Sequence, residues 1–358
     1  MHRYYPALDG VRAVAIGIVL AAHGGVAWFR SGGVGVDLFF VLSGFLITSI
    51  LAAEVAATGG LSLRHFYARR FLRLAPCLLL TCAFVAVALH LTTGRVPWSA
   101  IGIALTYTAN WVRAFSDADL SWLIHCWTLA IEEQFYLFWP LVVLGLERRV
   151  ADDRTKGFLL VCAALLVAVY RAGMVGLYTD ERINYGLDTR LDSLMAGAAL
   201  AYFARAWAAA PLGDGASRAL GRVAAPAALL VLLVVPRVVT WYSPWMGRYG
   251  YVLVAAASAV LLADLVVGRH SVLARVLSRA PLVYVGRISY GLYLLHLPVY
   301  FLVEGHLAHL PFGVRLALKL VLSLALAALS FHVLERPCLR LKARFEAAAP
   351  AAPRRAAA

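Results

Sequence analysis

The stretch LDGVRAVAIGIVLAAHGG, residues 8–25, decides the fold class. Its middle is apolar enough to cross a membrane, yet it carries Asp9, Arg12 and His23. Arg12 and His23 are eleven residues apart, so on a helix they would share one face, about 16 Å apart along the axis. Ionisable groups at membrane depth are costly and tend to mark a functional site. Snorkelling of Arg12 to lipid and a structural hydrogen bond of His23 are the ordinary alternatives.

The rest of the chain repeats this apolar pattern. Of its 358 residues, 62% are hydrophobic and only 15% are charged, whereas soluble domains are about 45–50% apolar. The apolar runs are continuous rather than alternating, which excludes an outer-membrane barrel. The composition predicts an all-α polytopic membrane protein, a bundle of about ten transmembrane helices. The predicted spans lie near 8–28, 35–54, 74–92, 126–146, 157–178, 188–206, 223–240, 248–267, 284–304 and 314–334.

One further apolar run, WSAIGIALTYTANWV at 98–112, is short and carries tryptophans at positions 98 and 111. We interpret it as an extra interfacial or re-entrant segment, because counting it as a span would place most basic loops outside. Without it, and with the N-terminus in the cytoplasm, 21 Lys and Arg residues face the cytoplasm and six face outward. This asymmetry follows the positive-inside rule. It predicts a multi-pass protein of the inner (plasma) membrane with both termini cytoplasmic.

The formal net charge of +14 points to membrane lipids as partners, because basic loops report orientation and contact with anionic lipids. Nucleic-acid binding is not expected. The five cysteines show neither pairing nor metal-ligand spacing, so no metal is expected. We expect residues 1–345 to form one transmembrane domain and the Ala/Pro-rich residues 346–358 to form a disordered cytoplasmic tail. The oligomeric state stays open.

Two polar motifs flank the membrane on opposite sides. Asp37 enters the second span near the outer face, close to His23 across a short hairpin, where a carboxylate could fix the imidazole tautomer. The alternative is a helix N-terminal acid favoured by the dipole. On the cytoplasmic side, RHFYARRFLRL places Arg69, Arg70 and Arg73 at i, i+1 and i+4. Three guanidiniums there form a natural phosphate clamp, unless they serve only as positive-inside anchors.

The run HCWTLAIEEQFYLFWPL, 125–141, is the most informative for chemistry. His125, Glu132 and Tyr136 fall on one helical stripe, and Glu133 lies about 100° round. Two adjacent acids inside an apolar helix must be paired or protonated. They are therefore either functional or part of a salt bridge between helices.

Two later motifs add ionisable groups. In VGRISYGLYLLHLPVYF, Tyr293, His296 and Tyr300 share one face in mid-membrane. A structural histidine bonded to a tyrosine is the alternative to a functional one. The sequence ERP, beginning at Glu335, is interpreted as a helix stop at the cytoplasm.

These motifs together resemble the acyltransferase-3 family of integral membrane O-acyltransferases. The fragments that carry the resemblance, in chain order, are LDGVRAVAI, GVDLFFVLSGFLIT, FYARRFLRL, WTLAIEEQFYLFWPL, RLDSLMAGA and ISYGLYLLHLPV. Together they cover nearly the whole chain. The resemblance implies ten spans and an acyl-CoA donor on the cytoplasmic side. It also implies transfer of an acyl group, often acetyl, to a hydroxyl of a sugar or sugar-bearing product.

Three family motifs map onto this sequence. The Arg-x10-His motif corresponds to Arg12 and His23, the RxxR motif to Arg70 and Arg73, and the membrane glutamates to Glu132 and Glu133. Acyl transfer from a thioester needs a base for the acceptor hydroxyl, stabilisation of the oxyanion and a grip on the CoA phosphates. We therefore expect the arginines, with the neighbouring Arg69, to hold acyl-CoA, which in this family is often acetyl-CoA.

The remaining roles follow from the same chemistry. We expect His23 to act as general base or as a transient acyl carrier, oriented by Glu132 or Glu133, with Tyr136 as an oxyanion donor and Asp37 beside the imidazole. The main alternative is a proton-coupled transporter or exporter, which also uses buried His, Glu and Arg. The acceptor stays open among a polysaccharide, a lipid-linked saccharide and a glycosylated natural product. The acyl chain length is open as well.

Overall fold

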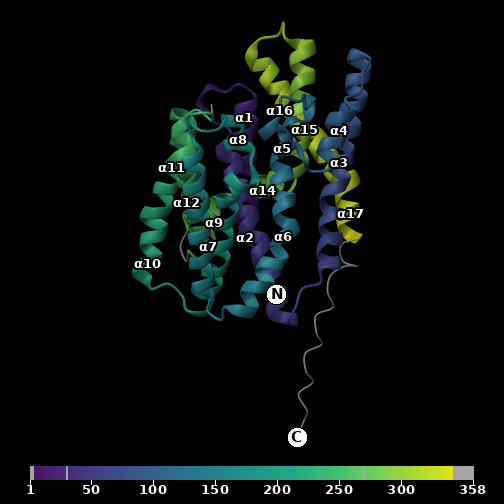
Figure 1. Cartoon of the computed structure of the whole chain (residues 1–358). Helices are drawn as coiled ribbons and strands as arrows, with labels where there is room; N and C mark the ends of the chain where they lie inside the picture. The colour runs from purple at the N-terminus through teal and green to yellow at the C-terminus, as the bar shows by residue number, and fades with distance from the viewer. Residues whose placement is uncertain (1–3, 30, 269–270, 342–358) are drawn as a thin grey trace.

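The computed structural model describes residues 4–29, 31–268 and 271–341, and this part of the chain is built from helices and short connections (Figure 1). The α-helices are α1 Pro6–His23, α2 Gly33–Thr58, α3 Leu63–Thr93, α4 Trp98–Leu105, α5 Ala109–Phe115, α6 Trp127–Arg149, α7 Asp153–Met174, α8 Asp180–Tyr185, α9 Leu187–Ala209, α10 Asp214–Ala219, α11 Ala225–Val238, α12 Tyr251–Val267, α13 Val272–Leu277, α14 Ala280–Arg287, α15 Ser289–Leu307, α16 Phe312–Ser330 and α17 Arg336–Leu341. Shorter 3₁₀ turns are η1 Ala27–Phe29 and η2 Ser121–Cys126, and π turns are η3 Leu220–Ala224, η4 Met246–Gly250 and η5 Phe331–Glu335.

The chain is an all-α polytopic membrane protein, as its composition predicts. Eight helical stretches in the described residues are long and apolar enough to cross a membrane: Pro6–His23, Gly33–Thr58, Leu63–Thr93, Ser121–Arg149, Asp153–Met174, Asp214–Val238, Met246–Val267 and Phe312–Leu341. The other two predicted spans correspond to α9 and α15, with 23 and 19 residues. These two helices are less apolar. α9 packs against α2, α7 and α12, and α15 packs against α16, α1 and α3, so neighbouring helices shield their polar groups from lipid.

The segment 98–112 does not form one helix. It divides into α4, with eight residues, and α5, with seven, and Tyr107 between them has a φ of +53°. At about 1.5 Å per residue, neither helix could cross some 30 Å of hydrocarbon. The interfacial or re-entrant placement of this segment stays a prediction.

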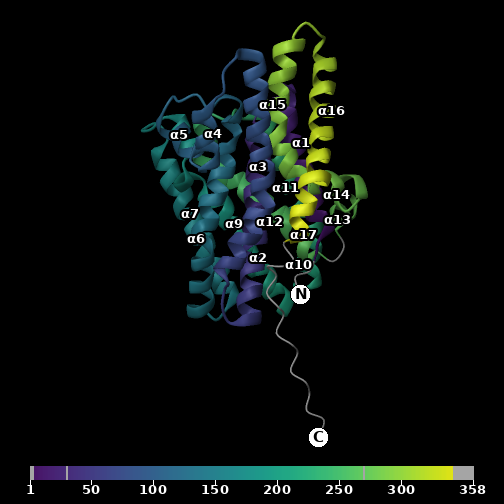
Figure 2. The same ribbon diagram turned by 90° about the vertical axis from the view of Figure 1, so that its right-hand side faces the viewer.

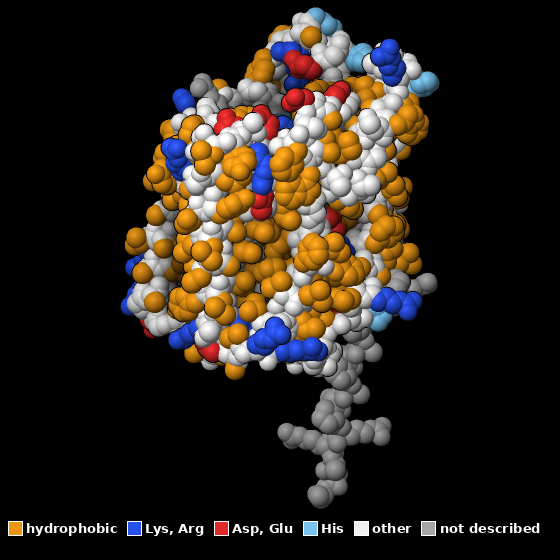
Figure 3. All heavy atoms as spheres, in the orientation of Figure 1, with side chains coloured by type: hydrophobic (Ala, Val, Ile, Leu, Met, Phe, Trp, Pro, Cys, Tyr) orange, Lys and Arg blue, Asp and Glu red, His pale blue; other side chains and the backbone are white. Residues whose placement is uncertain are grey.

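The long helices run side by side as one bundle, and in both ribbon views the α15–α16 hairpin and the end of α3 extend beyond their neighbours (Figures 1 and 2). The space-filling view shows hydrophobic side chains across the middle of one face, while most charged side chains lie toward its two ends (Figure 3). Such a belt is the surface that a lipid bilayer requires of a spanning protein.

Two glycines bring α2 and α9 into direct backbone contact. A Cβ on Gly44 would overlap the carbonyl group of Leu194, and a Cβ on Gly197 would overlap the carbonyl group of Val41. Small residues at such crossings let membrane helices approach closely and gain van der Waals contact. This contact fixes how α2 is turned relative to α9.

Two buried ion pairs connect α9 to its neighbours, one to α2 and one to α7. Asp37 Oδ1 of α2 lies 2.6 Å from Arg190 Nη2 of α9, and Arg171 Nη1 of α7 lies 2.7 Å from Asp192 Oδ2 of α9. Ser193 donates a further hydrogen bond to Asp37 at 3.1 Å. All four charged side chains are buried. Charges inside a membrane persist when they are paired in this way, so α2, α7 and α9 form one tightly connected unit.

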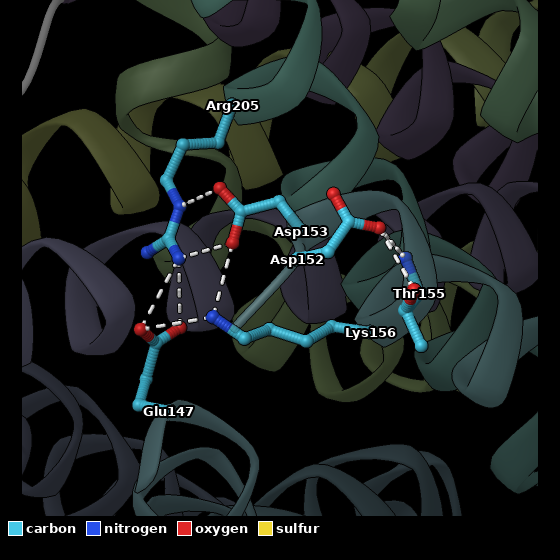
Figure 4. A network of polar contacts seen from close by, with 6 residues as sticks. All are labelled: Glu147, Asp152, Asp153, Thr155, Lys156 and Arg205. Carbon is cyan, nitrogen blue, oxygen red and sulfur yellow. Dashed lines mark hydrogen bonds and ion pairs between the residues drawn. The ribbon is translucent and has the colours of Figure 1, made fainter. Parts of the chain in front are cut away.

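A second charged network lies where α6 ends and α7 begins (Figure 4). Lys156 Nζ is 3.0 Å from Asp153 and 3.2 Å from Glu147. Arg205 of α9 donates to Glu147 at 3.0 Å and also to Asp153. The two acids and two bases compensate one another, and they join the ends of α6, α7 and α9.

Candidate active site

A cavity of about 140 Å³ lies among α1, α2, α3, α6 and α15. α2 supplies much of its apolar wall, including Phe39, Phe40 and Leu46. Its polar lining consists of Arg12, Ser43, Arg70, Arg73, Thr128, Glu132, Tyr136, Ser289, Tyr290 and Tyr293. Apolar walls with a few convergent polar groups are typical of small-molecule sites.

Three of the four predicted arginines, Arg12, Arg70 and Arg73, line this cavity and are called the arginine cluster below. Arg70 and Arg73 are three residues apart on α3, so they share one face. Arg69 lies about 100° round the helix and donates to Glu54 at 3.1 Å. The structure therefore does not bring Arg69 to the cavity, where the sequence pattern had placed it.

Arg70 is held on two sides. Its Nε and Nη2 lie 2.8 and 2.6 Å from Glu133 Oε1. Its guanidinium lies over the ring of Tyr136, 3.2 Å from the centroid. Charge-assisted hydrogen bonds and cation–π contact both favour one orientation, so Arg70 presents a fixed positive charge to the cavity.

Arg12 and Arg73 differ in their partners. Arg12 is paired with Asp9 at 2.7 Å. Arg73 is exposed and lies near enough to Arg12 and Arg70 to interact with their charges, but no hydrogen bond or ion pair to a described residue holds its guanidinium. A guanidinium with free donors at a cavity is suited to bind an anionic ligand.

The two adjacent glutamates have different surroundings, because successive helical residues point 100° apart. Glu133 forms an ion pair with Arg70, as described above. Glu132 lines the cavity beside Ser43, whose hydroxyl contacts both Glu132 and the hydroxyl of Tyr136. Within the described residues, neither glutamate contacts His23. The structure thus does not show the expected glutamate beside the imidazole.

His23 is the last residue of α1, and its exposed imidazole stacks on that of His296 from α15. Nδ1 of His23 lies 2.9 Å from Nε2 of His296. Gly24 and Gly25 follow, and Gly25 has a φ of +84°, a conformation that glycine adopts without strain and that ends helices. His23 and His296 are called the histidine pair below.

The structure does not place Asp37 against His23. The Asp37 carboxylate is buried against Arg190 and Ser193, and the imidazole of His296 takes the place beside His23. Asp37 lies one turn into α2, but the close contact of α2 with α9 turns it toward α9. The contacts of Asp37 are those of a residue that stabilises the bundle.

Tyr293 connects the histidine pair to the cavity. Its ring lies against those of His125 and His296, with centroids 5.4 and 5.6 Å away. Its hydroxyl accepts a hydrogen bond from Thr128 at 2.7 Å. Tyr293 and Thr128 both line the cavity. A chain of direct contacts therefore runs from the cavity to His23, and no sequence pattern indicated that Thr128 belongs to it.

Pro298 explains how His125 is held. A proline inside a helix cannot donate to the carbonyl four residues earlier, which leaves the carbonyl of Leu294 without its helical partner. Nε2 of His125 lies 3.0 Å from that oxygen. His125 belongs to the 3₁₀ turn η2 rather than to α6, so the predicted stripe from His125 to Glu132 is interrupted.

Glu335 also differs from the sequence prediction. The helix does not stop there, because α16 continues through the π turn η5 into α17. Glu335 is buried and accepts a hydrogen bond from Ser330 at 3.0 Å. A π turn adds one residue to a helical turn and so redirects this side chain inward. The sequence signal that could have indicated a buried Glu335 is its position directly after a long apolar run.

Comparison with known proteins identifies the family. A family model for acyltransferase-3 proteins, described as "Acyltransferase domain", matches residues 5–332. "Peptidoglycan O-acetyltransferase OatA" of Listeria monocytogenes is 32% identical over 94% of this chain and 56% of its own length. "Putative peptidoglycan O-acetyltransferase YrhL" of Bacillus subtilis is 33% identical over 94% of this chain and 55% of its own length.

This chain spans a little over half the length of the curated relatives it matches. No solved structure matches it. The family match includes every residue of the arginine cluster, the histidine pair and the cavity between them. The chain belongs to the acyltransferase-3 family.

Proposed function

We propose that the protein transfers an acetyl group from acetyl-CoA to a hydroxyl group of a cell-envelope polysaccharide. Peptidoglycan is the favoured acceptor, because the names of two curated relatives specify it. The observation that supports this proposal most is the cavity itself. It extends from the arginine cluster to Thr128 and Tyr293, and Tyr293 contacts the histidine pair. The proposed phosphate-binding residues line the cavity, and the proposed base adjoins it through Tyr293 and His296.

The arginine cluster suits the phosphate groups of a CoA donor. Arg12 and Arg70 each form an ion pair with an acidic residue, whereas the guanidinium of Arg73 is unpaired among the described residues. Guanidinium–phosphate contacts are charge-assisted and often bidentate, so Arg73 is assigned the first contact, with the other two arginines as positive neighbours. The apolar α2 wall would accommodate the donor's extended arm. The bound donor would supply a thioester, with the acyl group and a thiolate leaving group.

His23 is assigned as the general base. Its imidazole takes the proton of the acceptor hydroxyl while the hydroxyl oxygen bonds to the acyl carbon. The carbon–sulfur bond breaks, and the proton passes from His23 to the thiolate. A positioned acid–base group contributes about 10²–10⁴-fold to such a step. Tyr136 lies beneath Arg70 with its hydroxyl on Ser43, so it is assigned to orient Arg70 rather than to bind an oxyanion.

The orientation in the membrane follows from charge. The 21-to-6 distribution of Lys and Arg favours a plasma-membrane protein with the arginine cluster toward the cytoplasm, where CoA is made available, and His23 toward the outside. Arg12 lies in the first half of α1 and His23 at its end. One helix therefore carries a donor-binding residue and the base toward opposite membrane faces.

The experiment uses the full chain in lipid nanodiscs with acetyl-labelled acetyl-CoA and soluble peptidoglycan fragments. We expect free CoA thiol and acetylated saccharide in equal amounts, measured by thiol titration and mass spectrometry. A neutral glucan serves as the acceptor control. Reconstitution in liposomes examines the transporter alternative. Coupled proton flux without release of thiol would contradict the proposal and support a transporter.

A further inference from the structure

The hydrogen bonds of the histidine pair have one donor-to-acceptor order, which is set by a backbone carbonyl of α15. Nδ1 of His296 lies 2.5 Å from the carbonyl oxygen of Tyr293. A carbonyl oxygen only accepts hydrogen bonds, whereas an imidazole nitrogen donates when it carries a proton. Nδ1 of His296 is therefore the protonated nitrogen.

The second nitrogen of His296 follows from its burial. The side chain is fully buried, and the part of the chain that the structure describes brings no carboxylate into contact with it. Its ring neighbours are His23, His125, Tyr293 and Tyr300. A buried charge without a counter-ion is costly, so His296 is neutral. With one proton on Nδ1, Nε2 carries a lone pair.

This lone pair determines the tautomer of His23. Nδ1 of His23 lies 2.9 Å from Nε2 of His296, and because that nitrogen can only accept, Nδ1 of His23 must donate. The proton of a neutral His23 is then on Nδ1, and the lone pair is on Nε2. His23 is exposed at the end of α1, and among the described residues none makes a hydrogen bond to Nε2.

We infer that His296 is a positioning residue that holds His23 in the Nδ1-protonated form, leaving Nε2 to take the proton of the acceptor hydroxyl. The inference deepens the proposed function and rests on it for its catalytic part. In a Ser-His-Asp triad a buried carboxylate has this role. Here a neutral imidazole, itself held by a backbone carbonyl, replaces the carboxylate. This arrangement orients the base without placing another charge in the membrane interior, where charges are expensive.

The first test reads the tautomer directly in the wild-type protein. The full chain is labelled with ¹⁵N-histidine and placed in nanodiscs, and the His23 signals are identified by their loss in His23→Gln. The ¹⁵N chemical shifts distinguish a protonated ring nitrogen from one with a lone pair. We expect His23 to show a protonated Nδ1 and a bare Nε2. A His23 protonated on Nε2 would overturn the inference even if the protein proves to be an active acetyltransferase.

The second test compares His296→Leu with His296→Gln. The Gln carbonyl can accept from His23 at about the position of the lost Nε2, whereas Leu offers no acceptor. We expect kcat to fall by about 10²–10⁴-fold in the Leu variant and by about tenfold or less in the Gln variant, with the KM for acetyl-CoA unchanged in both. His306→Leu is the matched control, because His306 is an exposed histidine of the same helix and should keep full activity.

The two tests separate the inference from the function on which it rests. If neither wild type nor variant releases thiol, the function fails while the ¹⁵N signals still report the tautomer. A folded Leu variant with wild-type kcat contradicts the positioning role. Equal losses in the Leu and Gln variants, with His23 still protonated on Nδ1 in both, contradict it as well, because packing alone would then explain the loss.

Discussion

Replacing Arg73 with alanine should weaken donor binding and leave the stability of the protein nearly unchanged. Among the residues that the structure describes, none is bound to the Arg73 guanidinium, so its removal leaves no orphaned acid behind. Arg70 differs, because its loss would leave Glu133 without its cation. Truncating one member of such a pair costs more than the pair itself contributes. Arg73→Ala therefore measures the contact with the donor with little contribution from folding.

The magnitude follows from one charge-assisted contact to a phosphate group. Such a hydrogen bond contributes about 1.5–3 kcal/mol. Since about 1.4 kcal/mol is a factor of ten, the apparent KM for acetyl-CoA should rise by about 10- to 150-fold, with kcat at saturating donor within about twofold of wild type. Arg73→Lys keeps the charge but loses the planar guanidinium with its paired donors. Its KM for acetyl-CoA should therefore lie between those of wild type and Arg73→Ala.

The assay measures release of CoA thiol over a range of acetyl-CoA concentrations, with the unfolding temperature of each variant recorded in parallel. Arg69→Ala is the matched control, because Arg69 is the neighbouring cation on the same helix but is bound to Glu54 and does not line the cavity. Its KM should stay near that of wild type. The reasoning is refuted if both variants raise KM equally, or if Arg73→Ala lowers only the amount of inserted protein. In the latter case the arginine is a topology anchor.

Three further outcomes are expected. His23→Gln should reduce turnover by at least about 10²-fold with normal insertion, measured by thiol release, and near-normal turnover would refute its role as base. Asp37→Ala should lower the free energy of unfolding by about 3–5 kcal/mol, because it strands the buried cation of Arg190; a thermal-shift assay that finds no loss would contradict the structural role. Ser62→Cys, in a background without the exposed Cys162, should resist an impermeant thiol reagent in intact cells, and ready labelling would invert the proposed topology.

The fold class and the shared helix face of Arg70 and Arg73 could be predicted from the sequence because both depend on local order. Long apolar runs leave a helical bundle as the available structure, and residues three apart, such as Arg70 and Arg73, share a helix face whatever surrounds them. The break between helices at Tyr107 was harder to predict from the sequence. Its left-handed backbone divides an apolar run that composition alone presents as continuous, so the shortness of the run and the distribution of basic loops were the signals that it does not span.

The partners of His23 could not be predicted, for a different reason. His296 lies 273 residues away along the chain, and helical periodicity says nothing about which faces of distant helices meet. Asp37 was the first acid after His23 in the sequence, but the rotation of α2 about its own axis decides its direction. That rotation depends on the fit of Gly44 and Gly197 against backbone, a three-dimensional property. The inward turn of Glu335 similarly depends on a π turn that residue spacing does not reveal.

The glycine contact between α2 and α9 has a mechanical consequence. Backbone packed on backbone leaves no clearance for sliding, and rotation of α2 against α9 would break the buried Asp37–Arg190 ion pair, so these two helices behave as one rigid body. α15, which carries Tyr293 and His296, packs chiefly against α16, α1 and the turn η2, and its side chains around His296 are buried. The histidine pair is thus positioned by α1 and α15, outside the rigid α2–α9 unit.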